Sequence, residues 1–193
     1  MGLQISLFLL FILISAGHSL SCYQCAGNSC TQTTCSTGGS SCIASTNYYG
    51  NIKTTYKGCY PLSNCPTGSI NLGSLKASVY CCSSDLCNVQ DSADPNTNAP
   101  NGLKCYYCDG QNCSKTLSCS GTEDRCLSES GTIGNQSLIY KGCVSNSFCT
   151  GTASAYVGTN YTCCSGNLCN SAKSITQSLP LLCCFLLAFI LML

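Results

Sequence analysis

Histidine and tryptophan are almost missing from this sequence: it has no tryptophan, and its one histidine is His18. Histidine is the usual general base of serine and cysteine nucleophiles and the commonest metal ligand. The neighbouring carboxylates Glu123 and Asp124 stand in a Gly-Thr-Glu-Asp-Arg stretch that indicates a solvated loop. The sequence therefore predicts a protein that is not an enzyme, and we expect no catalytic residue, no cofactor and no metal.

Charge is also scarce, since only 8% of the residues are charged and the formal net charge is +1. The eight basic residues are spread along the chain and form no cluster. A nucleic-acid surface requires clustered lysine and arginine, so no nucleic-acid partner is expected.

Cysteine, in contrast, is abundant, with 22 in 193 residues. Cysteine above about a tenth of a chain is typical of a disulfide scaffold, and such scaffolds persist outside the reducing cytosol. The alternative is a thiolate metal store. Such stores use dense Cys-x-Cys repeats and few aromatic residues, whereas this sequence has no Cys-x-Cys and eleven tyrosines.

The two ends of the chain are apolar. Residues 5–16 form a hydrophobic run, and small residues follow it up to Ser19, which predicts a signal peptide over residues 1–19. Gly2 and Ser6 also match the myristoylation pattern. We disfavour that alternative because a myristoylated protein would keep its cysteines in the reducing cytosol.

The C-terminal run, residues 179–193, carries no charge. As a helix it would span about 22 Å, which is short of the ~30 Å hydrocarbon core. Small residues and a polar spacer precede it, an order that predicts a glycosylphosphatidylinositol (GPI) anchor signal over residues 171–193. The expected attachment residue is Asn170, with Ala172 as the alternative, and the expected location is the outer leaflet of the plasma membrane. A short membrane-spanning tail is the competing interpretation.

Between the two ends, twenty cysteines form two sets of ten, which indicates an internal duplication. The offset between partners is 83 for the first three, 84 for the next four and 82 for the last three. Other residues repeat as well: residues 56–59 and 140–143 both have the sequence Tyr-Lys-Gly-Cys. The duplication predicts two domains, residues 20–88 and 103–170, joined by an exposed linker over residues 89–102 that contains two prolines and no aromatic residue.

Each unit is near 70 residues, a length that buries little core, so covalent cross-links are expected. Short segments rich in threonine, tyrosine, isoleucine and valine alternate with glycine, asparagine and serine. Residues 43–46 and 52–56 around residues 47–51 are one example, and they predict a β-hairpin.

Each set of cysteines opens with Cys-Tyr-x-Cys and closes with Cys-Cys-x4-Cys-Asn. In this order and spacing the sequence closely resembles the lymphocyte-antigen/urokinase-receptor family of three-finger domains. The resemblance covers nearly all of the expected mature chain, twice. It implies a small, disulfide-rich, all-β fold with two tandem three-finger domains of the snake-toxin type.

Spacing alone leaves the pairing of ten cysteines open, but the resemblance implies one. In the first unit it implies Cys22–Cys42, Cys25–Cys30, Cys35–Cys59, Cys65–Cys81 and Cys82–Cys87. In the second unit it implies Cys105–Cys126, Cys108–Cys113, Cys119–Cys143, Cys149–Cys163 and Cys164–Cys169.

Three-finger domains carry function on the loops that the cysteine-rich hub holds in place. In the first unit, Tyr48, Tyr49 and Ile52 are expected to be exposed near the tip of the second finger and to bind a protein ligand, because tyrosine is enriched in binding hot spots. The third finger, residues 66–80, adds the apolar side chains of Ile70, Leu72 and Leu75. The competing interpretation is that these side chains only cover a thin sheet.

The favoured function is therefore a membrane-tethered receptor or co-receptor, resembling the multidomain urokinase receptor. One alternative is a complement regulator resembling protectin, whose activity depends on a tryptophan that this sequence lacks. Others are a soluble inhibitor resembling the two-domain phospholipase A2 inhibitors, and modulation of nicotinic receptors.

Glycosylation sequons begin at Asn112, Asn135 and Asn160, all in the second unit. The middle residue of the first sequon is Cys113, which is expected to be in a disulfide. The first unit therefore has the barer surface, and it is the expected ligand side.

Overall fold

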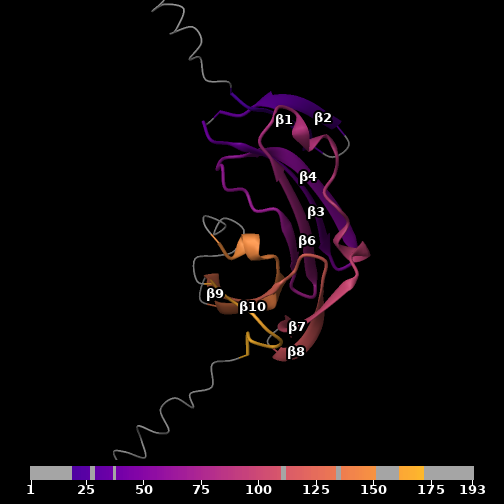
Figure 1. Cartoon of the computed structure of the whole chain (residues 1–193), viewed down its shortest axis with the longest axis vertical. Coiled ribbons are helices and arrows are strands. Elements are labelled where there is room, and N and C mark those ends of the chain that lie inside the picture. The colour runs from indigo at the N-terminus through magenta and orange to yellow at the C-terminus, as the bar shows by residue number, and fades with distance from the viewer. Residues whose placement is uncertain are drawn as a thin grey trace, which may run out of the picture.

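The computed structural model describes residues 19–26, 29–36, 38–109, 112–133, 136–150 and 161–171. Within these ranges the regular elements are β-strands and single-turn 3₁₀ helices, which confirms the all-β expectation (Figure 1). No helix in these ranges is long and apolar enough to cross a bilayer. The predicted signal peptide up to residue 18 and the predicted anchor signal from residue 172 lie outside the described residues.

Each domain has a separate first finger and a second and third finger that share a larger sheet. The first domain contains β1 Ser21–Ala26, β2 Ser29–Thr34, β3 Ser41–Tyr49, β4 Ile52–Tyr60, β5 Gly68–Asn71, β6 Leu75–Cys82 and the 3₁₀ turn η1 Cys87–Val89. After η2 Pro95–Thr97, the second domain contains β7 Pro100–Asp109, β8 Asn112–Ser120, β9 Arg125–Ile133, β10 Gln136–Val144, η3 Asn146–Phe148 and β11 Tyr161–Cys164.

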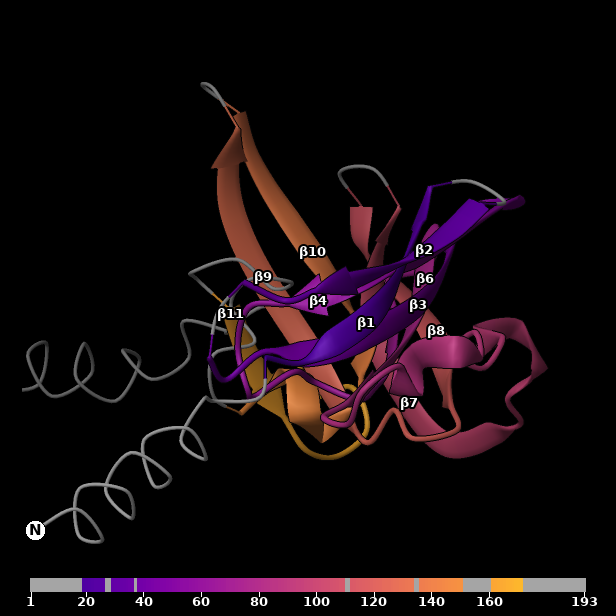
Figure 2. The same ribbon diagram turned by 90° about the horizontal axis from the view of Figure 1, so that it is seen from above.

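One seven-stranded sheet crosses the domain boundary. Its strand order is β11-β9-β10-β5-β6-β3-β4, while β1 with β2 and β7 with β8 form two-stranded sheets (Figures 1 and 2). The crossing point is the antiparallel pair β10 and β5, where Cys143 lies opposite Asn71 and Val144 opposite Ile70. The two domains therefore share one sheet and are not independent units joined only by a linker.

The largest cluster of buried apolar side chains spans both domains. It consists of Ile43, Tyr60, Ile70, Val79, Leu127, Val144 and Phe148. Strand pairing brings Ile70 of one domain against Val144 of the other. Because side chains opposite each other on paired strands share a face of the sheet, both domains contribute to one core on that face.

Among the described residues, ten disulfide bridges cross-link strands and loops within each domain, and they join the same pairs that the resemblance implied. In the first domain they are Cys22–Cys42, Cys25–Cys30, Cys35–Cys59, Cys65–Cys81 and Cys82–Cys87. In the second they are Cys105–Cys126, Cys108–Cys113, Cys119–Cys143, Cys149–Cys163 and Cys164–Cys169. In domains this small, each native bridge is worth roughly 2–5 kcal/mol.

The asparagine that ends each cysteine repeat closes its hub. The Asn88 side chain is fully buried; it accepts a hydrogen bond from the Tyr23 amide at 2.9 Å and donates to the carbonyls of Tyr23 and Ile43 at 2.9 and 3.0 Å. Only an amide offers one acceptor and two donors in this geometry. The side chain thereby joins the first finger to the second.

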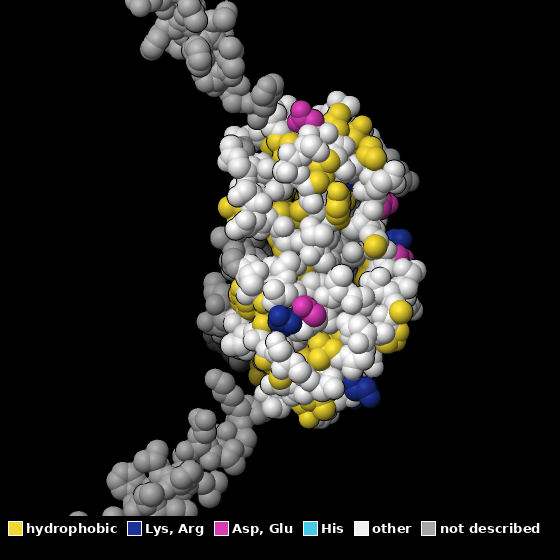
Figure 3. All heavy atoms as spheres, in the orientation of Figure 1, with side chains coloured by type: hydrophobic (Ala, Val, Ile, Leu, Met, Phe, Trp, Pro, Cys, Tyr) yellow, Lys and Arg dark blue, Asp and Glu magenta, His cyan; other side chains and the backbone are white. Residues whose placement is uncertain are grey.

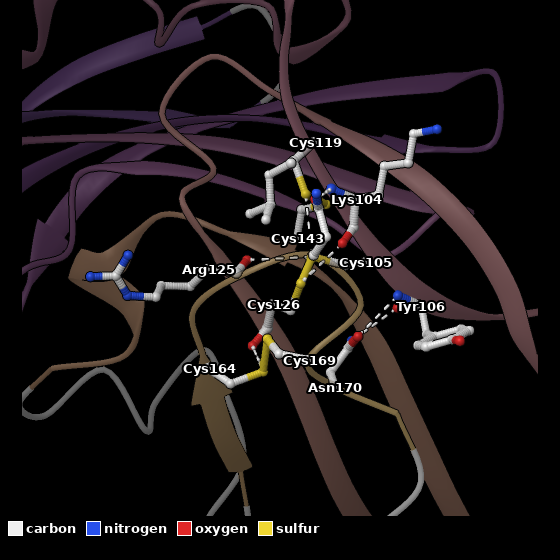
Figure 4. The surroundings of a disulfide bond; sticks show 12 residues. Lys104, Cys105, Tyr106, Cys119, Arg125, Cys126, Cys143, Cys164, Cys169 and Asn170 are labelled. Carbon is white, nitrogen blue, oxygen red and sulfur yellow. Dashed lines mark hydrogen bonds between the residues drawn. A yellow bond between two sulfur atoms is a disulfide. The ribbon is translucent and has the colours of Figure 1, made fainter.

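Asn170 repeats these contacts in the second domain. It accepts from the Tyr106 amide at 2.9 Å and donates to the Tyr106 carbonyl at 3.0 Å (Figure 4). It also donates to the Leu127 carbonyl at 2.7 Å. The side chain is 4% exposed. The residue predicted to carry the anchor is thus also a structural residue of the hub.

The segment between the domains is mostly exposed, but part of it packs against the first domain. Residues 89–99, here called the strap, lie along one face of the first domain, and Ser92 and Pro95 are buried. The Ser92 hydroxyl donates to the Ser78 carbonyl at 2.9 Å, and the Thr46 hydroxyl donates to the Ser92 carbonyl at 3.1 Å. The strap is part of the first domain because these polar groups pair with strands β3 and β6.

Candidate functional site: the finger-tip face of the shared sheet

The second finger of the first domain ends in a tight hairpin. Tyr49 and Ile52 lie directly opposite each other across a two-residue turn that begins with Gly50 at φ 58°. A positive φ at this place is cheap only for glycine, and it matches the twist of the flanking strands. The hairpin therefore presents Tyr49 and Ile52 side by side on one face.

These two side chains are the most exposed large apolar residues of the described chain, at 60% for Tyr49 and 67% for Ile52. Tyr56 points to the same face, four residues further along β4, and is 46% exposed. The expectation of an exposed, apolar finger tip is therefore confirmed for Tyr49 and Ile52. Tyr56 extends the patch toward the hub.

Tyr48 does not belong to this patch. It neighbours Tyr49 in a strand, so its side chain points to the opposite face, where it is half-buried under the strap. Its hydroxyl donates to Asp94 at 2.6 Å, and the Lys53 ammonium lies 3.5 Å from the same carboxylate and 5.9 Å from the Tyr48 ring centre. The expectation that Tyr48 is fully exposed is wrong, because its side chain lies against the strap and fastens it to the finger, while its ligand role stays a prediction.

The partners of Asp94 lower the pKa of its carboxyl group. The hydrogen bond from Tyr48 is the largest cause that lowers the pKa of Asp94, followed by the amide of Asn96 and the charge of Lys53. The carboxylate therefore stays ionised over a wide pH range, and the contact holds the strap in place. The contribution is modest because the group is exposed to solvent.

The second domain adds Tyr140 to the same face. Following the strand register from β3 through β6 and β5 to β10 puts Tyr140 on the side of the sheet that carries Tyr49. Tyr140 is 42% exposed, and it occupies the place of Tyr56 in the repeated Tyr-Lys-Gly-Cys motif. The sequence displays the repeated motif. It could not predict that the Tyr140 side chain lies exposed on this face, because that depends on how the domains pair.

We call Tyr49, Ile52, Tyr56 and Tyr140 the finger-tip face. Strands β9 and β10 form a long hairpin that diverges from the β3–β4 hairpin, so two fingers project beyond the core (Figure 2). Charged side chains are sparse on the side of the molecule that Figure 3 displays, where hydrophobic side chains are scattered among polar ones. The four exposed residues of the finger-tip face are uncharged and largely apolar, which suits contact with a protein ligand.

The third finger of the first domain is not exposed in the way the sequence suggested. Ile70 is 8% exposed and belongs to the shared core, while Leu72 and Leu75 are half-buried. The reason is the pairing of β5 with β10, which places this finger between the domains. Its apolar residues hold the two domains together.

Polar groups also connect the two domains where β5 pairs with β10, a contact called here the domain joint. The Ser145 amide donates to the Ser69 carbonyl at 2.9 Å, and the Ser69 amide donates to the Ser145 hydroxyl at 2.9 Å. The Ser147 hydroxyl donates to the Thr67 carbonyl at 2.8 Å. These bonds pair backbone groups that the joint would otherwise bury unsatisfied.

Glu123 lies next to this joint and is 1% exposed, so the expectation of a solvated loop is wrong for it. Its carboxylate accepts a hydrogen bond from the Ser120 amide at 2.8 Å. Burial raises the pKa of Glu123, and the Ser120 amide opposes that shift. A raised pKa means that Glu123 favours the fold most at acidic pH, and that this contribution is lost as the pH rises through the folded-state pKa.

A cleft of about 500 Å³ lies on the strap side of the sheet. Its walls come from both domains and the strap, and they include Ser78, Tyr80, Ala93 and Thr122. Tyr80 is 44% exposed there, on the face opposite Tyr49. This exposed tyrosine serves below as a control for the finger-tip face.

The sulfur clusters are not free metal ligands. Cys22, Cys35 and Cys59 bring their sulfurs within 4.8 Å of one another, as do Cys105, Cys119 and Cys143. Each of these sulfurs is in a disulfide. A bridged sulfur is not the thiolate that binds metal.

Of the three sequons, only the one at Asn112 falls within the described residues. Asn112 is exposed, and its side-chain oxygen accepts hydrogen bonds from the amide and the hydroxyl of Ser114 at 3.0 and 2.7 Å. Cys113 between them is bridged to Cys108. Asn135 and Asn160 lie outside the described residues.

The cysteine hubs, the three fingers in each unit and the closing asparagines define a recognisable kind of domain. A profile of the snake toxin and toxin-like protein family matches residues 20–88 and residues 103–170. This chain belongs to that family. Because the two matches cover most of the chain, the predicted duplication of a three-finger domain is confirmed.

Relatives of this toxin-like protein include three named groups. It is 32% identical over 130 residues to the urokinase plasminogen activator surface receptor of Mus musculus, a match that covers 60% of this chain and 40% of the receptor. It is 35% identical over 91 residues to lymphocyte antigen 6E of Gallus gallus, covering 42% of this chain and 69% of that protein. The chain thus spans about two fifths of the receptors that it matches.

A third relative matches across both units. The phospholipase A2 inhibitor CNF of Crotalus durissus terrificus is 30% identical over 165 residues, which is 72% of this chain and 80% of the inhibitor. These relatives are named as receptors, antigens and inhibitors. This toxin-like chain is therefore a two-unit three-finger protein similar to urokinase receptors and phospholipase A2 inhibitors.

Proposed function

We propose that this protein is a GPI-anchored binding protein of the cell surface that engages a protein ligand through its finger-tip face. The observation that carries the proposal is the exposure of Tyr49 and Ile52 at the end of a hairpin whose base is fixed by disulfides. Such side chains are costly to expose unless another molecule covers them.

Rigidity is the physical basis of the binding mechanism. The hub fixes the base of the second finger, and Tyr48 with Asp94 fixes its other face. The exposed side chains therefore lose little conformational freedom when a ligand covers them, and more of the gain from burying them appears as affinity. Tyr140 offers a second contact from the neighbouring domain.

A second candidate is a protein that binds and inhibits a phospholipase A2. It is favoured by one observation: the relative with that name matches across both units and over most of its own length. Both candidates use protein recognition rather than catalysis, and binding measurements distinguish them.

The first test uses two probes, a urokinase-type plasminogen activator and a secreted phospholipase A2. If either binds, the double substitution Tyr49→Ala with Ile52→Ala is expected to weaken binding at least about tenfold, because central apolar anchors carry most of the binding energy. Surface plasmon resonance on the purified protein measures the change. If neither binds, the same double variant is tested on the surface protein that the wild type captures.

The matched control is Tyr80→Ala, which removes a tyrosine of similar exposure from the opposite face. It is expected to leave the affinity unchanged. Weaker binding by the control variant, with an unchanged double variant, would move the site to the strap side and overturn the proposed face.

The anchor is proposed from the composition of the C-terminal run, which is uncharged, short for a membrane span and preceded by small residues. On transfected cells, a phosphatidylinositol-specific phospholipase is expected to release nearly all of the surface protein. Mass spectrometry of the released protein should find a C-terminus at residues 170–172. Surface protein that resists the enzyme and still carries Leu193 would mean a membrane-spanning tail.

A further inference from the structure

Strand β4 forms one edge of the seven-stranded sheet. It pairs with β3 on one side, and no described strand pairs with it on the other. Strand β1 packs beside β4, yet residues 52–56 are all exposed. An exposed edge that carries apolar side chains is a template for pairing with another strand.

The hairpin geometry determines which backbone groups face the open side. Residues that flank a two-residue turn exchange backbone hydrogen bonds, so Ile52 and Thr54 direct their amides and carbonyls toward β3. Lys53 and Thr55 alternate with these residues along β4. Their amides and carbonyls therefore point away from β3, toward the open side of the sheet. These outward groups can pair only with a strand that lies alongside β4.

The corresponding edge in the second domain is occupied at its hub end. Strand β10 matches β4 in the duplicated unit, and its edge pairs with β5 through Cys143 and Val144. Pro61 prevents a copy of that joint at β4, because it stands at the place of Ser145, whose amide donates to Ser69. Proline has no amide to donate. Pairing at β4 is therefore confined to residues 52–56, which lie further from the hub.

A second copy of the same strand fits this edge. When two antiparallel copies are centred on Thr54, the outward-facing Lys53 of one lies opposite Thr55 of the other, so their backbone groups can exchange hydrogen bonds. Shifting the centre by one residue either way places lysine opposite lysine, at Lys53 with Lys53 or at Lys53 with Lys57. Like charges directly opposite each other are unfavourable, so charge selects the register centred on Thr54.

The side chains agree with that register. On the finger-tip face, Ile52 of one copy lies opposite Tyr56 of the other, twice, with the two Thr54 side chains between them. Aromatic residues opposite β-branched residues, and threonine opposite threonine, are favourable cross-strand pairs. On the other face Lys53 of one copy lies opposite Thr55 of the other, and Lys53 and Lys57 keep their contacts with Asp94 and Asp91 of the strap at 3.5 and 3.0 Å.

We propose that two copies of this protein associate through their β4 edges, antiparallel about a two-fold axis at Thr54, into one continuous sheet. The proposal goes beyond the ligand-binding function and does not depend on it. The association would place two finger-tip faces on the same side of one assembly, and anchoring both copies in one membrane would raise their effective concentration.

The test is a cysteine at the two-fold axis. The full-length Thr54→Cys variant, expressed on transfected cells, is expected to form a disulfide-linked dimer, because residues opposite each other at a non-hydrogen-bonded position are within bridging distance. A non-reducing gel should show the dimer, and reduction should remove it. Thr55→Cys is the matched control: its diagonal separation from its copy, about 7–8 Å, is too long for a bridge.

A proline substitution on the β4 edge tests whether the cross-link requires strand pairing or arises from random collisions between copies. Adding Thr55→Pro to Thr54→Cys removes an outward amide that β3 does not use, and it is expected to reduce the dimer at least tenfold at equal surface level. Sedimentation velocity of the purified protein without the added cysteine should show the same loss of dimer with Thr55→Pro alone. No dimer with Thr54→Cys at normal surface level, equal dimer with Thr55→Cys, or no effect of the proline would overturn the proposal. Ligand binding by Thr55→Pro reports separately on the finger-tip face, which that substitution leaves intact.

Discussion

The Gly142→Val substitution is expected to separate the two domains while each keeps its own fold. Gly142 lies on β10 where that strand runs against β5, and a Cβ atom there would overlap the carbonyl oxygen of Asn71 and press on the side chain of Leu72. A backbone atom cannot swing aside as a flexible side chain can. The cost is therefore expected near the upper end of overpacking effects, about 3 kcal/mol.

Differential scanning calorimetry measures the effect. The wild-type protein is expected to unfold in one transition because the domains share a core, and Gly142→Val is expected to unfold in two. Gly58→Val is the matched control, since Gly58 holds the same place in the first repeat but its Cβ would meet only the Tyr56 side chain. Single transitions for both variants, at the wild-type temperature, would show that the domain joint contributes little.

Removing the asparagine at the hub is expected to have an effect of similar size. Asn88→Ala deletes three hydrogen bonds: it leaves the amide and the carbonyl of Tyr23 without their side-chain partner, and it removes a donor from the carbonyl of Ile43. A loss of about 3 kcal/mol follows, because each unsatisfied buried group costs roughly 1–3 kcal/mol and the groups can relax in part. Asn170→Ala is expected to do the same in the second domain.

Denaturant unfolding with the disulfides intact, together with the secreted yield, measures the loss. Asn64→Ala, at an exposed position, should leave both unchanged. Asn88→Asp should not rescue the fold, since an aspartate keeps the acceptor but loses both donors and buries a charge. A stable, well-secreted Asn88→Ala protein would show that the disulfides alone hold the hub.

Much of this protein was determined by local features that its sequence displays. Cysteine spacing, the duplicated set and the closing Asn88 and Asn170 carry the family resemblance that implied a pair of three-finger domains. The spacing by itself indicated only a duplicated disulfide framework. The turn residues around Gly50 predicted the hairpin tip, and Tyr49 and Ile52 are exposed there as expected.

Other features were decided only by the tertiary structure. Adjacent residues of a strand point to opposite faces, so the difference between exposed Tyr49 and strap-bound Tyr48 depends on which face the strap covers. The pairing of β5 with β10 similarly buries Ile70, and Glu123 is buried next to that contact between the domains. The same pairing places Tyr140 on the face of Tyr49. Such pairing joins residues more than seventy positions apart, and no local pattern specifies it, because its energy comes from contacts that exist only after both domains have folded.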